Sequence, residues 1–297
     1  MVQNVQIISA PSILGLKPTG VEELGKSLLQ HKLSDKIHSV IPVIHVPDLN
    51  ELYSDKKDPV TLCLNVAALH DFSVALSDTI TKDFSNSNFK LVLGGDCSIM
   101  IGVGVALKSI GTFGLIYVDA HADFYLPRQT PTGEAADMDL AIITGRGPSI
   151  LTSINAKHPY FLEKHVFHVG QRDEEETMKY GAQLITDTSI NCYSLKTIRK
   201  LGIRSVADTI TQKMQLQHTD GYWIHFDTDV LSDDINPAVD YRLPGGLQYE
   251  EVTDLIKSCI KTGKVAGMTV TIFNPKLDPS GKISRQINEC IADAFNS

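Results

Sequence analysis

The stretch FGLIYVDAHAD at residues 113–123 runs from a mainly apolar segment into alternating polar residues. Six mainly apolar residues in succession are typical of a strand that is buried on both faces of a parallel sheet. Beyond this segment, Asp119, His121 and Asp123 stand two residues apart, and in an extended chain such residues share one face. The stretch therefore predicts a central strand whose carboxyl end presents metal-binding side chains in one direction.

Two other apolar runs end in the same way. Asp227 and Asp229 follow one of them, and His225 has the same strand parity as Asp227. The other ends in GGDCS at 94–98, where the glycines allow a close approach of the backbone and the cysteine could point into a site. Four carboxylates gathered without a cation would repel one another, so the three strand ends predict a site for two divalent ions. His225 is either a nitrogen donor behind this site or a histidine packed in the core.

Short apolar runs alternate with stretches of helical periodicity along the whole chain. The expected strands are residues 5–8, 40–44, 90–93, 113–118, 166–169, 222–226 and 265–272. The expected helices are residues 21–30, 60–82, 100–109, 203–217, 250–261 and 283–295. This alternation predicts an α/β fold, a three-layer α/β/α sandwich around a central, mostly parallel sheet. With no linker or repeat in the sequence, we expect residues 1–297 to form a single catalytic domain.

The composition indicates which classes of partner and which cellular compartment to expect. The net charge of −8 without a basic run argues against nucleic acid or an anionic membrane surface as a partner, and fits a cationic small molecule. No apolar segment approaches the roughly 20 residues that cross a bilayer, and we expect no signal peptide at residues 1–15. Five scattered cysteines without a CxxC pair favour a reducing, cytoplasmic location.

The three strand ends together resemble the signatures of the ureohydrolases, the superfamily of arginase and agmatinase. GGDCS at 94–98, DAHAD at 119–123 and FDTDVLSDDINP at 226–237 are similar to GGDHS, DAHxD and FDxDxxxP, in the same order. GQR at 170–172 and PGG at 244–246 are weaker matches. The resemblance implies the arginase-like fold, and marks a divergent branch in which a cysteine replaces the first histidine ligand.

The resemblance also implies a pair of Mn²⁺ ions in each chain. The ligands implied are Cys97, Asp119, His121, Asp123, Asp227 and Asp229. In the family pattern Asp119 and Asp227 bridge the ions, and oxygen-rich ligand sets of this kind suit hard divalent metals. Cys97 would be a softer thiolate ligand, which opens the site to zinc, cobalt or iron; alternatively it is a buried thiol beside a weakened site.

By resemblance, the chemistry is hydrolysis of a carbon–nitrogen bond in a linear guanidine or amidine. A hydroxide that bridges the metals would attack the guanidine carbon and release urea or a substituted urea. Asp229 would hold this nucleophile and pass its proton to the leaving amine. The family also implies a homo-oligomer, a trimer or a hexamer.

The residues around the implied site depart from the family pattern. The proton-shuttle histidine of arginase corresponds to Ala136 here, so that Glu134 or Asp137 would take over proton transfer, unless both are solvated loop charges. The glutamate that pairs with the substrate guanidinium corresponds to Ile272. We therefore expect a modified guanidine, such as an N-hydroxylated or substituted one, rather than free arginine.

Substrate contacts must come from other acidic residues. Glu134 is a candidate for the amidine, and Asp173 and Glu175 are candidates for a substrate ammonium, although a solvated helix start explains the latter pair equally well. Two other functions stay open. One is a formimino-type amidine hydrolase, and the other is a non-catalytic relative that binds a metal or a small molecule.

Overall fold

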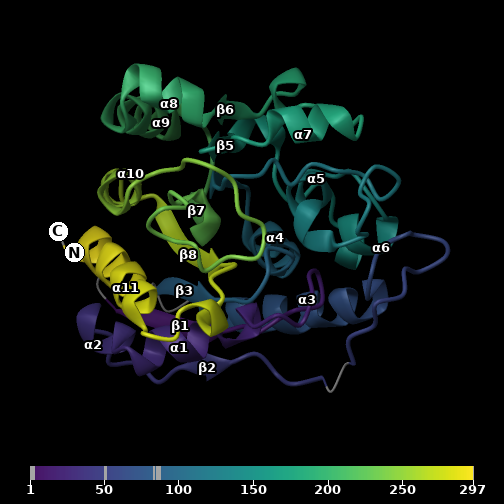
Figure 1. Cartoon of the computed structure of the whole chain (residues 1–297), viewed down its shortest axis with the longest axis horizontal. Coiled ribbons are helices and arrows are strands. Elements are labelled where there is room, and N and C mark those ends of the chain that lie inside the picture. Colours follow the sequence, from purple (N-terminus) through teal and green to yellow (C-terminus); the bar gives the residue numbers. More distant parts are fainter. Residues whose placement is uncertain (1–3, 50–51, 83, 85–87, 297) are drawn as a thin grey trace.

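The computed structural model describes residues 4–49, 52–82, 84 and 88–296, and its centre is one eight-stranded, all-parallel sheet (Figure 1). The strands are β1 Val5–Ser9, β2 Ile44–His45, β3 Phe89–Leu93, β4 Phe113–Val118, β5 Val166–Val169, β6 Asn191–Tyr193, β7 Gly221–Asp227 and β8 Val265–Thr271. Their order across the sheet is β2-β1-β3-β8-β7-β4-β5-β6. The expected parallel α/β sheet is confirmed.

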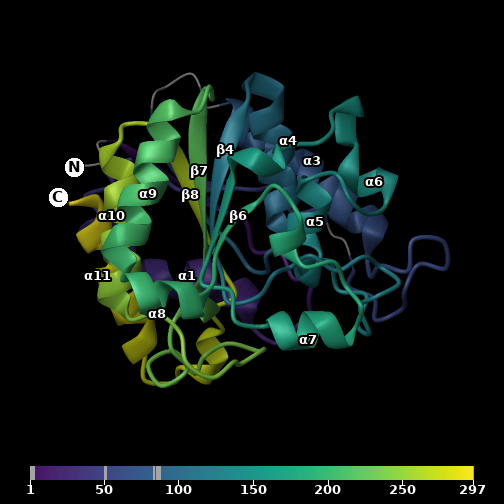
Figure 2. The same ribbon diagram turned by 90° about the horizontal axis from the view of Figure 1, so that it is seen from above.

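Helices cover both faces of this sheet, as Figure 2 shows with α9, α10 and α11 on one side and α3, α4 and α5 on the other. The α-helices are α1 Leu24–Gln30, α2 Leu33–Lys36, α3 Val66–Lys82, α4 Ile99–Ile110, α5 Asp139–Ile143, α6 Ser149–Thr152, α7 Glu174–Lys179, α8 Leu195–Leu201, α9 Ile203–Leu216, α10 Tyr249–Lys261 and α11 Lys282–Phe295. Successive residues of β4 serve opposite layers, because Ile116 packs with α9 to α11 and Tyr117 with α3 and α4.

Several boundaries differ from the sequence expectation. Of the strand expected at 40–44, only Ile44 lies in a strand, β2. The edge strand β6 was not predicted, because its three residues contain no apolar run. The helix expected from residue 60 begins at Val66 instead. The carboxylate of Asp58 accepts hydrogen bonds from the backbone of Val60 and Thr61, and this local turn replaces the first helical turns.

The sheet brings the carboxyl ends of β3, β8, β7 and β4 together at one edge. β8 lies between β3 and β7, so the three expected strand ends are not all direct neighbours, and Thr271 of β8 joins them. The turn after β3 requires Gly95, because a Cβ atom there would lie 1.8 Å from the carbonyl oxygen of Ser12. In the described part of the chain, every helix is too short or too polar to cross a membrane.

Candidate metal centre

Potential metal ligands gather beyond the carboxyl ends of β3, β4 and β7. They are Cys97, Asp119, His121, Asp123, Asp139, His225, Asp227 and Asp229. All are buried except His121, whose side chain is 22% exposed. Asp139 was not predicted as a member from the sequence.

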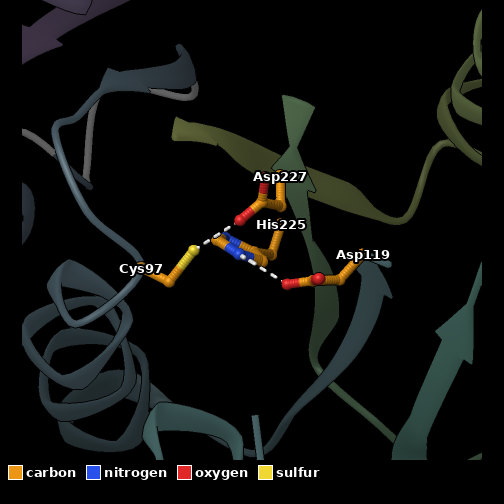
Figure 3. A group of neighbouring side chains, drawn as sticks. All are labelled: Cys97, Asp119, His225 and Asp227. Carbon is orange, nitrogen blue, oxygen red and sulfur yellow. Dashed lines mark hydrogen bonds and ion pairs between the residues drawn. The ribbon is translucent and has the colours of Figure 1, made fainter. Parts of the chain in front are cut away.

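The first set, the inner group, comprises Cys97, Asp119, His225 and Asp227. One donor atom from each lies within 4.8 Å of the donor atoms of the other three. The Sγ atom of Cys97 is 2.8 Å from Oδ2 of Asp227 and 3.2 Å from Oγ1 of Thr271. Figure 3 shows the imidazole of His225 between the Cys97–Asp227 pair and Asp119. The inner group thus offers sulfur, nitrogen and oxygen donors around one small volume.

The second set, the outer group, comprises Asp119, His121 and Asp229, again with donor atoms within 4.8 Å of one another. The Nδ1 atom of His121 is 2.9 Å from Oδ2 of Asp229 and 3.8 Å from Oδ1 of Asp119. Because Asp119 belongs to both groups, the two potential ion positions are adjacent. This arrangement is what a pair of ions with a shared carboxylate requires.

Local turns aim the two central aspartates at the site. Oδ1 of Asp227 accepts a hydrogen bond from the backbone N–H of Asp229 at 2.8 Å, and Oδ1 of Asp119 accepts one from His121 at 2.7 Å. Each aspartate therefore keeps Oδ2 for the site. Arg172 supports the turn after Asp227 by donating to the carbonyl groups of Asp229, Val230 and Leu231. The alternating sequence pattern is thus converted into two convergent carboxylates.

The electrostatics of the cluster favour a bound cation. Burial, followed by neighbouring carboxylates, raises the pKa of Asp119 and of Asp227 well above the usual range. Burial opposes a charged imidazole, but Asp229 and Asp119 outweigh it and raise the pKa of His121 to about 10. Among the described residues, Oδ2 of Asp119 and both ring nitrogens of His225 have no hydrogen-bond partner. Orphaned donor atoms in an anionic, buried cluster fit divalent metal ions.

One carboxylate oxygen of Asp123 has a partner outside the inner and outer groups. Its Oδ2 accepts a hydrogen bond from the Tyr117 hydroxyl at 2.7 Å, and the same hydroxyl lies 3.0 Å from Oδ1 of Asp139. One hydroxyl has a single proton to donate, so one of the two carboxyl groups must carry a proton of its own. Burial raises the pKa of both aspartates well above the usual range, followed by repulsion from Asp139 in the case of Asp123 and from Asp119 in the case of Asp139. Asp123 belongs to neither group of close donor atoms found in the described residues.

The model of the arginase family matches residues 22–295 of this chain. The chain belongs to the arginase family. The arginase of Staphylococcus aureus strain MSSA476 is 27% identical over 304 residues, covering 98% of this chain and 96% of that protein. The solved arginase of Bacillus caldovelox superposes with a TM-score of 0.89 at 24% identity, covering 99% of this chain and 98% of the other. The formimidoylglutamase of Bacillus subtilis has a TM-score of 0.72 at 19% identity, covering 99% and 87%. The ureohydrolase resemblance and the arginase-like fold are thereby confirmed.

In this arginase-family chain the cluster opens into a cavity of about 400 Å³. Its acidic lining residues are Asp123, Glu134, Asp137, Asp173, Glu176, Asp227, Asp229 and Asp240. Glu175, which was expected to bind a substrate ammonium, is not among the described residues that line the cavity. Its neighbour Glu176 lines the cavity instead. The wall beside Cys97 includes Ala136 and Ile272, the two positions at which a departure from the family pattern is expected from the sequence. Ile272 has a φ of 71°, an unusual conformation for a β-branched residue.

The two acidic candidates for substrate binding already have partners within the fold. Glu134 is 1% exposed, lies 3.3 Å from Nζ of Lys17, and accepts a hydrogen bond from Tyr241 at 2.8 Å. Asp173 accepts hydrogen bonds from the backbone of Ala122 and from the side chains of Gln171 and Thr177. Both line the cavity, but their carboxylates also hold its walls in place.

Asp137 differs from these two residues. Its Oδ2 accepts hydrogen bonds from the hydroxyl groups of Thr130 and Thr132, whereas Oδ1 is buried and has no hydrogen-bond partner among the described residues. Burial outweighs these hydrogen bonds and raises the pKa of Asp137 to about 7. Asp137 thus places a carboxyl group whose pKa is raised towards neutrality among the residues that line the cavity.

Proposed function

We propose that this arginase-family chain is a binuclear metal-dependent hydrolase of a carbon–nitrogen bond in a linear guanidine or amidine, and that it releases urea or a substituted urea. The observation that carries the proposal is the sharing of Asp119 by two groups of buried donor atoms at the floor of an acid-lined cavity. Two divalent ions supply Lewis acidity that activates water for nucleophilic attack near neutral pH.

The proposed ligands fall into two sets. Asp119, His121 and Asp229 hold the outer ion, and Cys97, Asp119 and Asp227 hold the inner one. Sulfur beside carboxylates makes the inner position suitable for zinc, cobalt or iron as well as manganese. The remaining ligand of the inner ion is considered separately below, because Asp123 is bonded to Tyr117.

We assign proton transfer to Asp137 rather than to Glu134. The free Oδ1 of Asp137 and its pKa of about 7 suit a group that accepts and returns a proton during turnover. We assign the positioning of the nucleophile to Asp229, whose carboxylate is oriented by the backbone N–H of Ala120, which donates to Oδ1 at 3.3 Å. Glu134, already neutralised by Lys17, is assigned to substrate binding.

The cavity lining favours a cationic substrate whose guanidine is altered. Apart from the residues of the cluster and Glu134, which is paired with Lys17, the lining includes Asp173, Glu176 and Asp240, and the basic Arg242 is paired with Asp233. These carboxylates attract positive charge. At the position of Ile272, however, a guanidinium would meet an apolar side chain and would lose a bidentate carboxylate partner. An N-hydroxylated or substituted guanidine depends less on that carboxylate, and we propose this class as the substrate.

Product analysis with a panel of substrates tests the proposal. Metal-free protein reloaded with Mn²⁺, Co²⁺, Zn²⁺ or Fe²⁺ would be assayed for urea and hydroxyurea release from free, N-hydroxylated and N-substituted guanidines. Metal-dependent release from at least one of them is expected, with Asp227→Ala as the inactive control. Formamide or ammonia as the product would favour the formimino-type alternative instead. Fewer than one ion per chain at saturating metal would favour a non-catalytic binding protein.

A further inference from the structure

His225 lies in a row of side chains directly beneath the metal cluster. Parallel register pairs His225 of β7 with Tyr117 of β4 on one side and with Thr269 of β8 on the other, and Tyr117 is paired in turn with His168 of β5. The rings of His225 and Tyr117 stack with centroids 4.5 Å apart. The imidazole of His225 is therefore held in place by packing on the floor of the site.

The neighbours of His225 in this row are bonded elsewhere. The Tyr117 hydroxyl is bonded to Asp123 and Asp139. The Thr269 hydroxyl accepts a hydrogen bond from Trp223 at 2.8 Å and donates to the Met100 sulfur. His225 is completely buried, and neither ring nitrogen has a hydrogen-bond partner in the described chain. Buried imidazole nitrogens without any partner are rare, so this arrangement points to a missing ligand.

His168 gives the contrast within the same row. It is equally buried, but its Nε2 atom lies 2.8 Å from the carbonyl oxygen of His121, so one ring nitrogen has a partner. An ordinary packed histidine is therefore possible at this level of the sheet. His225 differs because its Nε2 atom faces Oδ2 of Asp119, another buried atom that lacks a hydrogen-bond partner among the described residues.

The distance between these two orphaned atoms suits a shared ion. Nε2 of His225 and Oδ2 of Asp119 are 4.0 Å apart, too far for a hydrogen bond. Imidazole nitrogen and carboxylate oxygen each lie about 2.0–2.2 Å from a zinc ion, so two such ligands at the tetrahedral angle are about 3.3–3.6 Å apart. A shift of about half an ångström between the two side chains therefore brings both donor atoms onto one ion. Donor atoms of Cys97 and Asp227 complete the same group within 4.8 Å.

We propose that His225 replaces Asp123 as a ligand of the inner ion, giving a site of one thiolate, one imidazole and two carboxylates. The inference rests on the proposed function in one respect, that the cluster binds two ions. Four ligands that include sulfur and nitrogen favour zinc or cobalt in a tetrahedral arrangement over manganese. Asp123 then serves the network of Tyr117 and Asp139 rather than the metal.

Cobalt is a suitable probe because Cys97 belongs to the inner group alone. Metal-free protein would be titrated with Co²⁺. The metal content of the protein gives the total number of bound ions, and the thiolate-to-cobalt charge-transfer absorption reports only the inner ion. We expect two ions in the wild type and one thiolate band. In His225→Phe, which keeps an aromatic ring against Tyr117, the affinity of the inner ion should fall at least about 100-fold while the outer ion stays bound.

Two further variants complete the comparison. Asp123→Asn should retain the thiolate band, with inner-ion affinity within about tenfold of the wild type. His165→Phe changes another buried histidine just before the opposite, amino end of β5, and should leave both ions unchanged. X-ray absorption of the wild type loaded with zinc needs no variant, and should count one imidazole on each of the two ions.

The outcomes separate the inference from the proposed function. The replacement of Asp123 by His225 would be overturned if the thiolate band were unchanged in His225→Phe, or if it were lost in Asp123→Asn. The proposed function would stand in either case, provided that the wild type binds two ions. Should His225→Phe not fold, a single imidazole for two zinc ions in the wild type would overturn the inference by itself. Fewer than two ions in the wild type would overturn both.

Discussion

The sulfur of Cys97 lies 2.8 Å from Oδ2 of Asp227, so the thiol in the turn just before α4 contacts a carboxylate that ends β7. Burial, followed by Asp227, raises the pKa of this thiol well above its usual range while no cation is bound. A metal ion reverses that effect, because a coordinating thiol is deprotonated. Position 97, where the family pattern has a histidine, is therefore the point at which the proposed metal site of this chain differs most directly from that pattern.

Substitution of Cys97 should separate the two ions. Cys97→His is expected to preserve or raise Mn²⁺ affinity and to lower the preference for zinc and cobalt, because imidazole replaces a softer thiolate. Cys97→Ala should weaken the inner ion alone. Isothermal titration with each metal measures both effects, and Cys259→Ala, a buried thiol on α10, is the matched control. Identical metal binding by Cys97→His and Cys97→Ala would place residue 97 outside the ligand set.

The stability of the metal-free protein should fall as the pH rises from about 7 to 9, above the range in which the lowered pKa values of His168 and His225 act in the opposite direction. The raised pKa values of Asp119, Asp227 and His121 mean that the folded state binds more protons than the unfolded chain over this range. Each extra proton in the folded state lowers stability by about 1.4 kcal/mol per pH unit. Metal binding releases these protons, so the gain in Tm on adding Zn²⁺ or Mn²⁺ should grow over the same range.

Thermal unfolding at a series of pH values, with and without metal, measures both slopes. Asp227→Asn removes one of the raised carboxyl groups and should flatten the slope of the metal-free protein. A Tm for the metal-free wild type that is constant or rises with pH would contradict the electrostatic description of the cluster.

Introducing a carboxylate at position 272 should restore recognition of a simple guanidinium. Ile272 lines the cavity at the position where the family pattern has a glutamate. Ile272→Glu is expected to raise kcat/KM for arginine or agmatine at least about tenfold, because a buried guanidinium gains a bidentate partner. Ile272→Gln has the same size without the charge and should give little gain. Equal rates for the two variants would mean that the guanidine does not reach this wall.

Asp137 should control the pH dependence of turnover. Asp137→Asn is expected to lower kcat at least about 100-fold and to remove a limb of the pH–rate profile near pH 7, the pKa of its carboxyl group. Glu134→Gln should raise KM more than it lowers kcat, because Glu134 is bonded to Lys17 and Tyr241. An unchanged pH profile in Asp137→Asn would remove this residue from proton transfer.

The sequence was sufficient for the parallel sheet and for most of the cluster. Long apolar runs identified the buried strands, and the polar residues after Val118 identified the end of β4. The extended geometry expected for Asp119, His121 and Asp123 was wrong, because β4 ends at Val118 and Asp123 has a φ of 46° in the turn that follows. Periodicity could not identify Asp139, whose approach to Tyr117 depends on how α5 packs against α4. It also could not show the pairing of Glu134 with Lys17, because that contact joins segments far apart in the chain.

Anomalous scattering from crystals grown with excess Zn²⁺ or Co²⁺ tests the central claim most directly, because it locates each ion among the side chains. We predict two peaks, one beside Cys97, His225 and Asp227 and one beside His121 and Asp229, with Asp119 between them. Crystals in which these side chains are ordered but have no peak between them would contradict it.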